Sequence, residues 1–458
     1  PAIETATAGW AAAFLASIAM YFQLSASRDT DRRLVIAGLP KSKLVAGRLA
    51  TGFVLAALAT AAALLTLWLR TGIDDSTRVV AGTLMFAVIY LGIGAVVATV
   101  ARNPVNGTVL ILFVWLLDVF MGPTQSAASA EQTITRFLPT HFVTLWMVDL
   151  PLRHGGQLSD LGWAIVWTVG AAIVAFVVVA QTARQPRRRG ARRVGSATDQ
   201  LLATTGQGIR DWRRNPVLWV LLVVVPSMFI LLADAITPHG STSIVLNQGG
   251  DLVTAALDPA RIHAGTMVPI AIGTLSALAG LFLALDARPG DRRLALAGMR
   301  TGPLLAARMT VVSLAAVMAV VVSLAAAAFV FDARQWGVYA AANVLVALTY
   351  GLVGVILGPL FGRVSGVFIA FVVPFLDLGI GQSPMLRPEP ETWAHFLPGY
   401  GASRILIDGG LTGSFDEYGA LMIALAWLGG LIVAATMLFH PPKVSTSRVP
   451  ELAELAGV

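Results

Sequence analysis

Asp31-Arg32-Arg33-Leu34 recurs 260 residues later as Asp291-Arg292-Arg293-Leu294, and the surroundings of the two tetrapeptides also match. In each copy an apolar run ends, a basic stretch containing Ala-Gly follows, and a second apolar run begins. Further pairs keep this spacing, which shortens to 259 towards the carboxyl end of each copy. The pairs are Gly38 and Gly298, Arg48 and Arg308, Tyr90 and Tyr350, Gly94 and Gly354, then Gly107 and Gly366, Asp118 and Asp377, and Phe137-Leu138-Pro139 and Phe396-Leu397-Pro398. The pattern indicates an internal duplication, which in polytopic membrane proteins commonly places a pathway between two related halves.

The composition is that of a membrane protein. Hydrophobic residues make up 56% of the chain and charged residues only 12%, whereas a soluble domain has about 25% charged residues. Several apolar runs are about 20 residues long, which is enough to cross the hydrocarbon core as a helix. These run lengths disfavour a soluble helical solenoid, the other architecture that a duplicated helical chain could adopt. The absence of cysteine excludes disulfides, thiolate catalysis and cysteine-ligated metals.

We therefore predict an all-α polytopic membrane protein with two tandem, pseudo-two-fold related six-span units. Eleven spans are visible, at 8–24, 47–69, 79–100, 107–122, 159–181, 216–236, 266–286, 306–330, 338–361, 366–382 and 417–439. The first span of the first unit is missing, so we expect a natural protein with twelve spans and at least ~45 more residues. The predicted domains are the first unit at 1–181, a basic linker with an amphipathic helix at 182–214, the second unit at 215–440 and a tail at 441–458.

The distribution of basic residues predicts the orientation of the chain. One face carries 24 of the 32 Lys and Arg residues, including those of the linker and the tail. By the positive-inside rule this face is cytoplasmic, so the linker and the carboxyl terminus are cytoplasmic. The strong preference for Arg over Lys in an Ala-rich chain is typical of a high-GC bacterial genome. We therefore expect a multi-pass protein of the bacterial plasma membrane in contact with its lipids.

Motifs for catalysis are absent from the sequence. There is no Gly-x-x-x-x-Gly-Lys-Ser/Thr loop for phosphates, no His-Glu-x-x-His motif and no pair of carboxylates at catalytic spacing. The six His residues are scattered over loops and span ends. We expect that the chain is not an enzyme and binds no cofactor, metal or nucleic acid. Its basic runs are typical of segments that contact an anionic membrane surface.

The repeated cytoplasmic loops, 28–48 and 288–308, predict a docking element. Leu34 and Gly38 in the first copy, like Leu294 and Gly298 in the second, are spaced for a short helix with a small apolar face. Asp31 or Asp291 would lie at the amino terminus of that helix, where its charge is favourable. The positive-inside rule explains only the basic residues of these loops. The duplicated Asp, Leu, Ala and Gly therefore favour docking to a cytoplasmic partner.

The long outer segments 123–158 and 383–416 each contain Phe-Leu-Pro followed by a moderately apolar stretch. These stretches are too short to span the membrane, so we predict short helices that dip into the outer leaflet. Asp118 and Asp377 lie late in the preceding spans, and an acid at such a position is a functional candidate. A structural role is favoured, in which each carboxylate pairs with an outer arginine such as Arg136 or Arg404, or bonds the backbone of the dipping helix.

Taken together, these features resemble those of the ABC transporter permeases of the type 2 exporter class. Their unit has an interfacial amphipathic helix, six spans, a coupling helix between spans two and three, and re-entrant outer helices between spans five and six. The matching parts here are 201–214, the spans from 216, the loop 286–308 and the segment 383–416, while the motif at 263–270 resembles the start of the second span. The chain looks similar to the fused two-unit permeases of high-GC Gram-positive bacteria, which are associated with export of antibiotics and other drugs.

The resemblance implies two copies of a separate ATPase subunit, which would bind ATP and Mg, and an amphipathic small-molecule substrate. The ATPase-coupling candidates are Asp31, Arg32, Arg33, Leu34, Gly38, Asp291, Arg292, Arg293, Leu294 and Gly298. The family's path runs between spans two and five of each half. The residues that could line it are Phe14, Tyr21, Trp115, Asp118, Phe371, Phe375 and Asp377, although packing against lipid explains each aromatic equally well.

Two other readings stay open. A secondary transporter of the major facilitator type also has twelve spans and an Asp-Arg pair after span two. Its outer loops are short, however, and its flanking Gly and following Gly-Arg are not found at the expected positions around Asp31 and Asp291. A membrane scaffold without transport activity is the third class. Substrate identity leaves no motif in the sequence.

Overall fold

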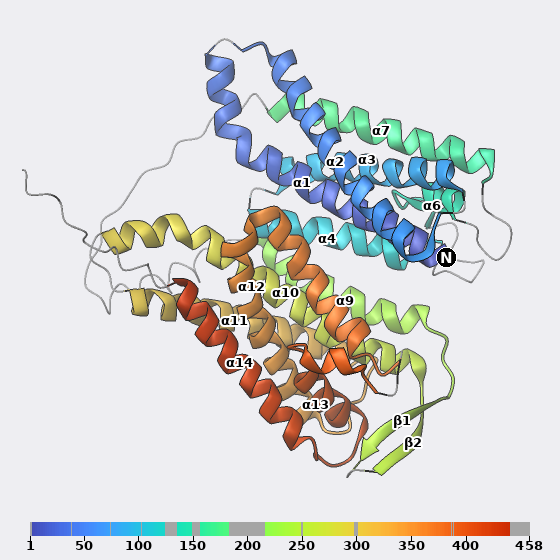
Figure 1. Cartoon of the computed structure of the whole chain (residues 1–458), viewed down its shortest axis with the longest axis vertical. Helices are drawn as coiled ribbons and strands as arrows, with labels where there is room; N and C mark the ends of the chain where they lie inside the picture. The colour runs from blue at the N-terminus through green and yellow to red at the C-terminus, as the bar shows by residue number, and fades with distance from the viewer. Residues whose placement is uncertain are drawn as a thin grey trace, which may run out of the picture.

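The computed structural model describes residues 2–37, 39–73, 75–101, 103–123, 135–148, 156–182, 216–248, 251–296, 301–385, 387 and 389–439. Two predicted domains, the linker 182–214 beyond its first residue and the tail 441–458, lie outside these ranges. The described chain forms two helical halves, one from α1 to α7 and one from α9 to α14, which lie against each other (Figure 1).

Capping and helix-breaking residues set the ends of the helices in the first half. Asn103 caps the helix that opens with Pro104, since its side chain accepts a hydrogen bond from the Val105 amide at 2.9 Å. Asp75 does the same for the helix at Ser76 by accepting from the Arg78 amide at 3.2 Å. The helices of this half are α1 (Ala2–Ile36), α2 (Lys41–Thr71), α3 (Ser76–Val100), α4 (Pro104–Phe120), α6 (His141–Met147) and α7 (Leu158–Thr182).

The second half contains the longest helices of the described chain. Gly362, with φ 69° and ψ −159°, breaks α12 in a conformation that favours glycine. This break falls between the predicted spans 338–361 and 366–382. The elements of this half are α9 (Pro216–Ile236), β1 (Thr242–Gln248), β2 (Asp251–Leu257), α10 (Pro259–Leu296), α11 (Thr301–Ala327), α12 (Trp336–Pro374), the π-helix η1 (Phe375–Gly381), the 3-10 helix η2 (Thr392–Phe396), α13 (Tyr400–Leu411) and α14 (Tyr418–Phe439).

A nearly all-helical chain with long apolar helices is a polytopic membrane protein. Within the described ranges, eight helices are long and apolar enough to cross a membrane, and α4 and part of α9 form shorter apolar helices. A helix or helix segment lies at each predicted span position. The number of eleven crossings and the two six-span units remain predictions, because helix length and composition alone do not show a crossing.

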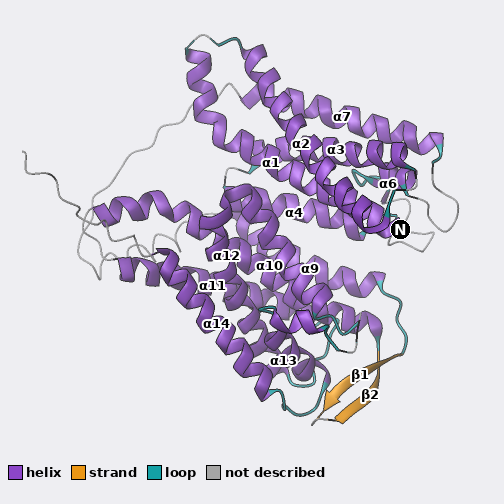
Figure 2. Ribbon diagram, viewed as in Figure 1, coloured by secondary structure: helices purple, strands orange, loops and turns teal. Residues whose placement is uncertain are grey.

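The prediction of an all-α chain is wrong at one place. Between α9 and α10, strands β1 and β2 pair antiparallel, with Thr242 opposite Leu257 and Gln248 opposite Asp251. Figure 2 shows this hairpin at one end of the second half, away from the first half. The predicted spans 216–236 and 266–286 left this region as a loop.

Repeated glycines allow close helix packing in both halves. A Cβ atom on Gly94 of α3 would collide with the carbonyl oxygen of Ser17 in α1. The same holds for Gly354 of α12 and the carbonyl oxygen of Ala277 in α10. Both members of the second pair lie 260 residues after their counterparts. The two halves therefore use equivalent backbone contacts, which supports the duplication.

Candidate functional site

Aromatic side chains fill the boundary between the two halves. The ring of Phe14 in α1 lies 5.4 Å from that of Trp115 in α4 and 5.4 Å from that of Phe371 in α12. Trp115 and Phe371 are 5.1 Å apart, edge to face, and Phe371 stacks on Phe375 at 6.2 Å. Phe368 joins them at 6.2 Å from Phe14. We call these five residues the inter-half aromatic cluster; such geometries are favourable for aromatic pairs.

Hydrogen bonding fixes the orientation of Trp115. Its indole N–H donates to the carbonyl oxygen of Trp10 at 2.7 Å, which ties α4 to α1. Phe14 and Phe371 are almost completely buried. The cluster is therefore a packed contact between the two halves.

A small apolar cavity adjoins the cluster. Phe371 and Phe375 contribute to its wall together with residues of α4, α9 and α10, including Phe229 and Met267. The buried hydroxyl of Thr274 also lines it and has no hydrogen-bond partner within the described ranges. The wall is therefore apolar except for this one hydroxyl.

Tyr21 does not join the cluster. Its hydroxyl donates to the carbonyl oxygen of Asn103 at 3.1 Å, and its ring occupies the space that a side chain at Gly107 would need. Tyr21 therefore positions the start of α4 against α1. Of the seven residues predicted for the pathway, the structure brings together Phe14, Trp115, Phe371 and Phe375.

Asp118 lies near the carboxyl end of α4 and is only 1% exposed. The Tyr90 hydroxyl donates to its carboxylate at 2.9 Å, and the Thr140 hydroxyl donates at 2.7 Å. The Thr140 amide, at the start of α6, adds a third bond at 3.3 Å. All three partners are donors, which is the set that a buried carboxylate requires. We call Asp118, Tyr90 and Thr140 the first aspartate cluster.

The second half repeats this arrangement. The Tyr350 hydroxyl donates to Asp377 at 2.6 Å, and the Gly399 amide, at the start of α13, donates at 2.7 Å. The Gln382 side chain donates at 3.3 Å. Gly399 lies 259 residues after Thr140, as Asp377 lies after Asp118. We call Asp377, Tyr350, Gly399 and Gln382 the second aspartate cluster. Each aspartate cluster joins three segments of its half.

The predicted arginine partners do not take part. Arg404 pairs with Glu417 at 2.9 Å, and Arg136 is exposed. The sequence left open two structural roles, a pairing with an arginine and a bond to the backbone of a short helix. The structure shows the second, because the amides of Thr140 and Gly399 donate to the two aspartates. The sequence analysis noted Tyr90 and Tyr350 as repeat pairs but missed them as partners of the aspartates, although the shared spacing was a usable signal.

The helix ends that carry the repeated tetrapeptides differ from the prediction. Asp31 does not begin a short helix, since α1 continues unbroken to Ile36. Its carboxylate instead accepts a hydrogen bond from Ser27 at 2.9 Å and forms an ion pair with Arg48 of α2. Asp291 likewise lies within α10 and not at a helix start. No Gly or Pro lies close before Asp31, whereas Pro289-Gly290 directly precedes Asp291 without ending α10.

The remaining coupling candidates are only partly described. Arg33 and Leu34 are exposed at the end of α1, Leu34 to 40%, and the neighbouring Ile36 is exposed to 74%. Gly38 and Gly298 lie outside the described residues. The side chains of Arg32, Asp291, Arg292, Arg293 and Leu294 also lie outside them, so their role in coupling stays a prediction.

Residues 8–180, which contain most of the first half, match the family model described as ABC-2 family transporter protein. This part of the chain is therefore similar to the membrane component of ABC transporters, which works with an ABC ATPase. No curated protein matches the chain. The match supports the resemblance to the type 2 permeases, and together with the apolar helices it indicates a multi-pass membrane protein.

Proposed function

We propose that the chain is the fused, two-unit permease subunit of an ATP-driven exporter, and that it moves amphipathic, drug-like molecules out across the bacterial plasma membrane. The observation that carries this proposal is the match of residues 8–180 to the ABC-2 transporter family. The repeated aspartate clusters and glycine contacts extend it to the second half, because they give α9 to α14 the same internal framework.

The inter-half aromatic cluster is the proposed substrate pathway. It lies where helices of both halves meet, and the adjoining cavity presents aromatic and aliphatic side chains with no charged group. Separation of the halves would expose these rings, which bind flat apolar groups by dispersion and cationic groups through the ring faces.

The cytoplasmic end of α1 is the proposed contact for an ATPase subunit. It presents Arg33 beside the exposed Leu34 and Ile36, a combination of charge and apolar surface that suits a protein partner. The Asp31–Arg48 ion pair joins α1 to α2 just above this end. A displacement of the contact would therefore move both helices. The repeated sequence predicts a second contact at Asp291–Leu294 and hence two ATPase subunits, which bind ATP and Mg themselves.

The test uses the chain with its co-purified ATPase in proteoliposomes. Movement of a fluorescent amphipathic dye, Hoechst 33342, is followed after ATP addition. The variant Arg33→Glu is expected to reduce ATPase association and ATP-driven transport about tenfold or more, because charge reversal places repulsion in the contact. Arg70→Glu is the matched control, since Arg70 is exposed at the opposite end of α2.

Three outcomes would refute the proposal. Dye transport driven by an ion gradient with no ATPase present would establish a secondary transporter of the facilitator type. ATPase activity of the complex that is insensitive to Arg33→Glu would favour a scaffold. Absence of ATP-driven transport in the intact complex would exclude an exporter of such dyes.

A further inference from the structure

The helix α9 has no counterpart among the described elements of the first half. The repeat spacing of 260 residues makes α10 the equivalent of α1 and α11 the equivalent of α2. Helix α9 packs on both α10 and α11. The other helices that α11 packs on are α10, α12 and α14, and α2 packs on their equivalents α1, α3 and α7. Within the described ranges, α9 is therefore the one packing partner of α11 for which α2 has no equivalent.

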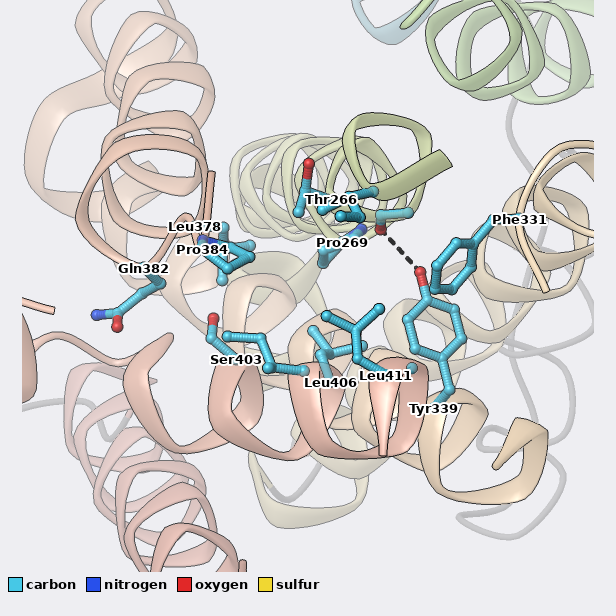
Figure 3. A pocket seen from close by; sticks show the side chains of 14 residues that line it. Thr266, Pro269, Phe331, Tyr339, Leu378, Gln382, Pro384, Ser403, Leu406 and Leu411 are labelled. Atoms are coloured by element: carbon cyan, nitrogen blue, oxygen red, sulfur yellow. Dashed lines mark hydrogen bonds between the residues drawn. The ribbon is translucent and has the colours of Figure 1, made fainter. Parts of the chain in front are cut away.

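Two opposite faces of α10 are covered by different elements. On one face the Gly265 carbonyl oxygen accepts a hydrogen bond from the Tyr339 hydroxyl of α12 at 2.8 Å (Figure 3). The opposite face carries Met267 and Ala271, which are four residues apart and only 8% and 7% exposed. These two residues line a small apolar space together with Phe229 of α9. The second face of α10 is therefore covered by α9.

The equivalent face of α1 is less buried, although the side chains are the same. Ala271 and Leu275 of α10 are 7% and 9% exposed. Ala11 and Leu15 lie 260 residues earlier, in α1, and both are partly exposed. Because each pair compares identical residue types, the difference arises from the neighbours of the helix and not from its sequence.

The register of α2 against α11 is fixed by a contact that both halves make. A Cβ atom on Gly52 of α2 would lie 3.2 Å from Leu91 of α3, and one on Gly351 of α12 would lie 3.2 Å from Val312 of α11. Val312 and Gly351 lie 260 residues after Gly52 and Leu91. Ala56, one turn further along, and its equivalent in α11 are both fully buried. One face of α2 is therefore covered just as it is in α11.

A second face of α2 is covered only in the second half. Val54 and its equivalent Leu314 are 58% and 43% exposed, as expected for side chains that face lipid. The next position differs, since Leu55 is partly exposed whereas its equivalent Ala315 is only 5% exposed. The same difference recurs along the helix at Thr51, Ala59 and Ala63, whose equivalents Val311, Ala319 and Ser323 are buried. We call Ala11, Leu15, Thr51, Leu55, Ala59 and Ala63 the α1–α2 face.

Helix α9 also contacts the opposite half. Its Phe229 ring lies 5.6 Å from the Phe120 ring of α4, edge to face. Leu116 of α4 lines the same apolar space and is 2% exposed. Phe375, which lies 259 residues after Leu116, is partly exposed. A helix placed on the α1–α2 face as α9 is placed on α10 and α11 would therefore also touch the second half near Phe375.

We propose that the α1–α2 face is the docking surface for one apolar membrane-spanning helix, which the chain itself supplies ahead of α1. This helix packs on α1 and α2 as α9 packs on α10 and α11. The face carries no charged side chain, and its short side chains allow the close approach that stabilises helix pairs in lipid. The repeat spacing places the equivalent of α9 about 45 residues ahead of residue 1. The inference goes beyond the proposed function, because docking of this helix requires neither ATP nor a substrate.

The test is site-specific photocrosslinking of the natural full-length chain in lipid nanodiscs. A diazirine amino acid replaces Leu55 on the α1–α2 face, and crosslinked peptides are mapped by tandem mass spectrometry. We expect crosslinks from position 55 to a peptide that precedes residue 1. The same amino acid at Ala315 is the positive control and should crosslink to α9. Val54 is the matched negative control, since it is adjacent to Leu55 and 58% exposed, and it should give lipid adducts alone.

A second site keeps the test decisive. Ala59 takes the diazirine amino acid if replacement of Leu55 impairs folding. Lipid adducts alone at the chosen site would show that lipid covers the face, and this result would overturn the proposal. Crosslinks confined to residues 1–458, or formed with a separate protein, would overturn it as well. Failure of ATP-driven dye export would leave the crosslinks unchanged, so the two proposals are separable.

Discussion

Removal of the Tyr90 hydroxyl tests whether the first aspartate cluster holds α3, α4 and the start of α6 together. Tyr90→Phe keeps the buried ring and removes one donor from Asp118, which retains its two bonds from Thr140. A hydrogen bond to a charged group contributes about 1.5–3 kcal/mol in soluble proteins, but interhelical bonds in membranes average only about 0.6 kcal/mol. Because this acceptor is fully buried, we expect the free energy of unfolding to fall by about 1–2 kcal/mol.

Asp118→Asn is expected to cost more, about 3 kcal/mol. The new amide N–H₂ group faces donors on the side where the carboxylate accepted them, so at least one buried group loses its partner. In the double variant the Tyr90 bond is already absent, so the two costs should not add. The double-mutant cycle should give a coupling energy of about 1 kcal/mol or more, well above the scatter of about 0.5 kcal/mol for independent sites.

The assay is reversible SDS unfolding of the purified chain in mixed micelles, followed by circular dichroism. Tyr350→Phe with Asp377→Asn repeats the cycle in the second half, where the corresponding bond is 2.6 Å long. Tyr418→Phe is the control, because Tyr418 is 66% exposed and its change should lie within about 0.5 kcal/mol. Additive effects of Tyr90→Phe and Asp118→Asn would refute the reasoning, since the side chains would then not interact.

Two further predictions concern packing and pH. Gly94→Ala should destabilise the chain by about 1–3 kcal/mol, because the new methyl group meets the Ser17 backbone. Gly47→Ala should instead stabilise α2 by about 0.5–1 kcal/mol, because a methyl group there meets no other atom. Thermal unfolding of the two variants distinguishes these outcomes. The hydrogen bond from His239 to Asp258 raises the pKa of His239 and lowers that of Asp258. Because the His239 pKa is raised, its contribution to stability is lost as the pH rises through that pKa. Because the Asp258 pKa is lowered, its contribution is lost as the pH falls through that pKa. The pair therefore stabilises the fold most between about pH 4 and 6.5. NMR titration should show the His239 pKa returning towards its ordinary value in Asp258→Asn, and an unchanged pKa would contradict the pairing.

Hydrophobicity alone predicted the positions of the helices, because apolar runs of membrane length leave few alternatives to a helix. The prediction of a helix start at Asp31 was wrong, because α1 continues to Ile36. Between Leu24 and Ile36 the sequence has no Gly or Pro, so nothing ends α1 before the Gly-Leu-Pro sequence that follows Ala37. A charged stretch changes the environment of a helix without stopping it.

The sequence contains a β-hairpin signal that an analysis of hydropathy alone does not use. Gly249-Gly250 separates two runs rich in Val, Leu and Thr, which is a typical hairpin sequence. An assignment of the region as an outer loop left this unused. The aspartate clusters needed more than a pattern, since Tyr90 and Asp118 come from different helices and meet only because α3 and α4 pack side by side. Repeat spacing indicated that both residues matter, but not that they touch.

A comparison of the two halves distinguishes the contacts that set the fold of each half from the positions at which the halves differ. Equivalent residues at the 259 or 260 spacing form the helix contacts at Gly94 and Gly354 and both aspartate clusters. These features set the fold of each unit, and they cannot distinguish one substrate from another because they are buried and satisfied. The halves also differ at equivalent positions, since Met147, which packs on Gly82 of α3, corresponds to Leu406 in the second half. The features that the two halves share therefore set the fold, and a difference in specificity between the halves can arise only where their residues differ.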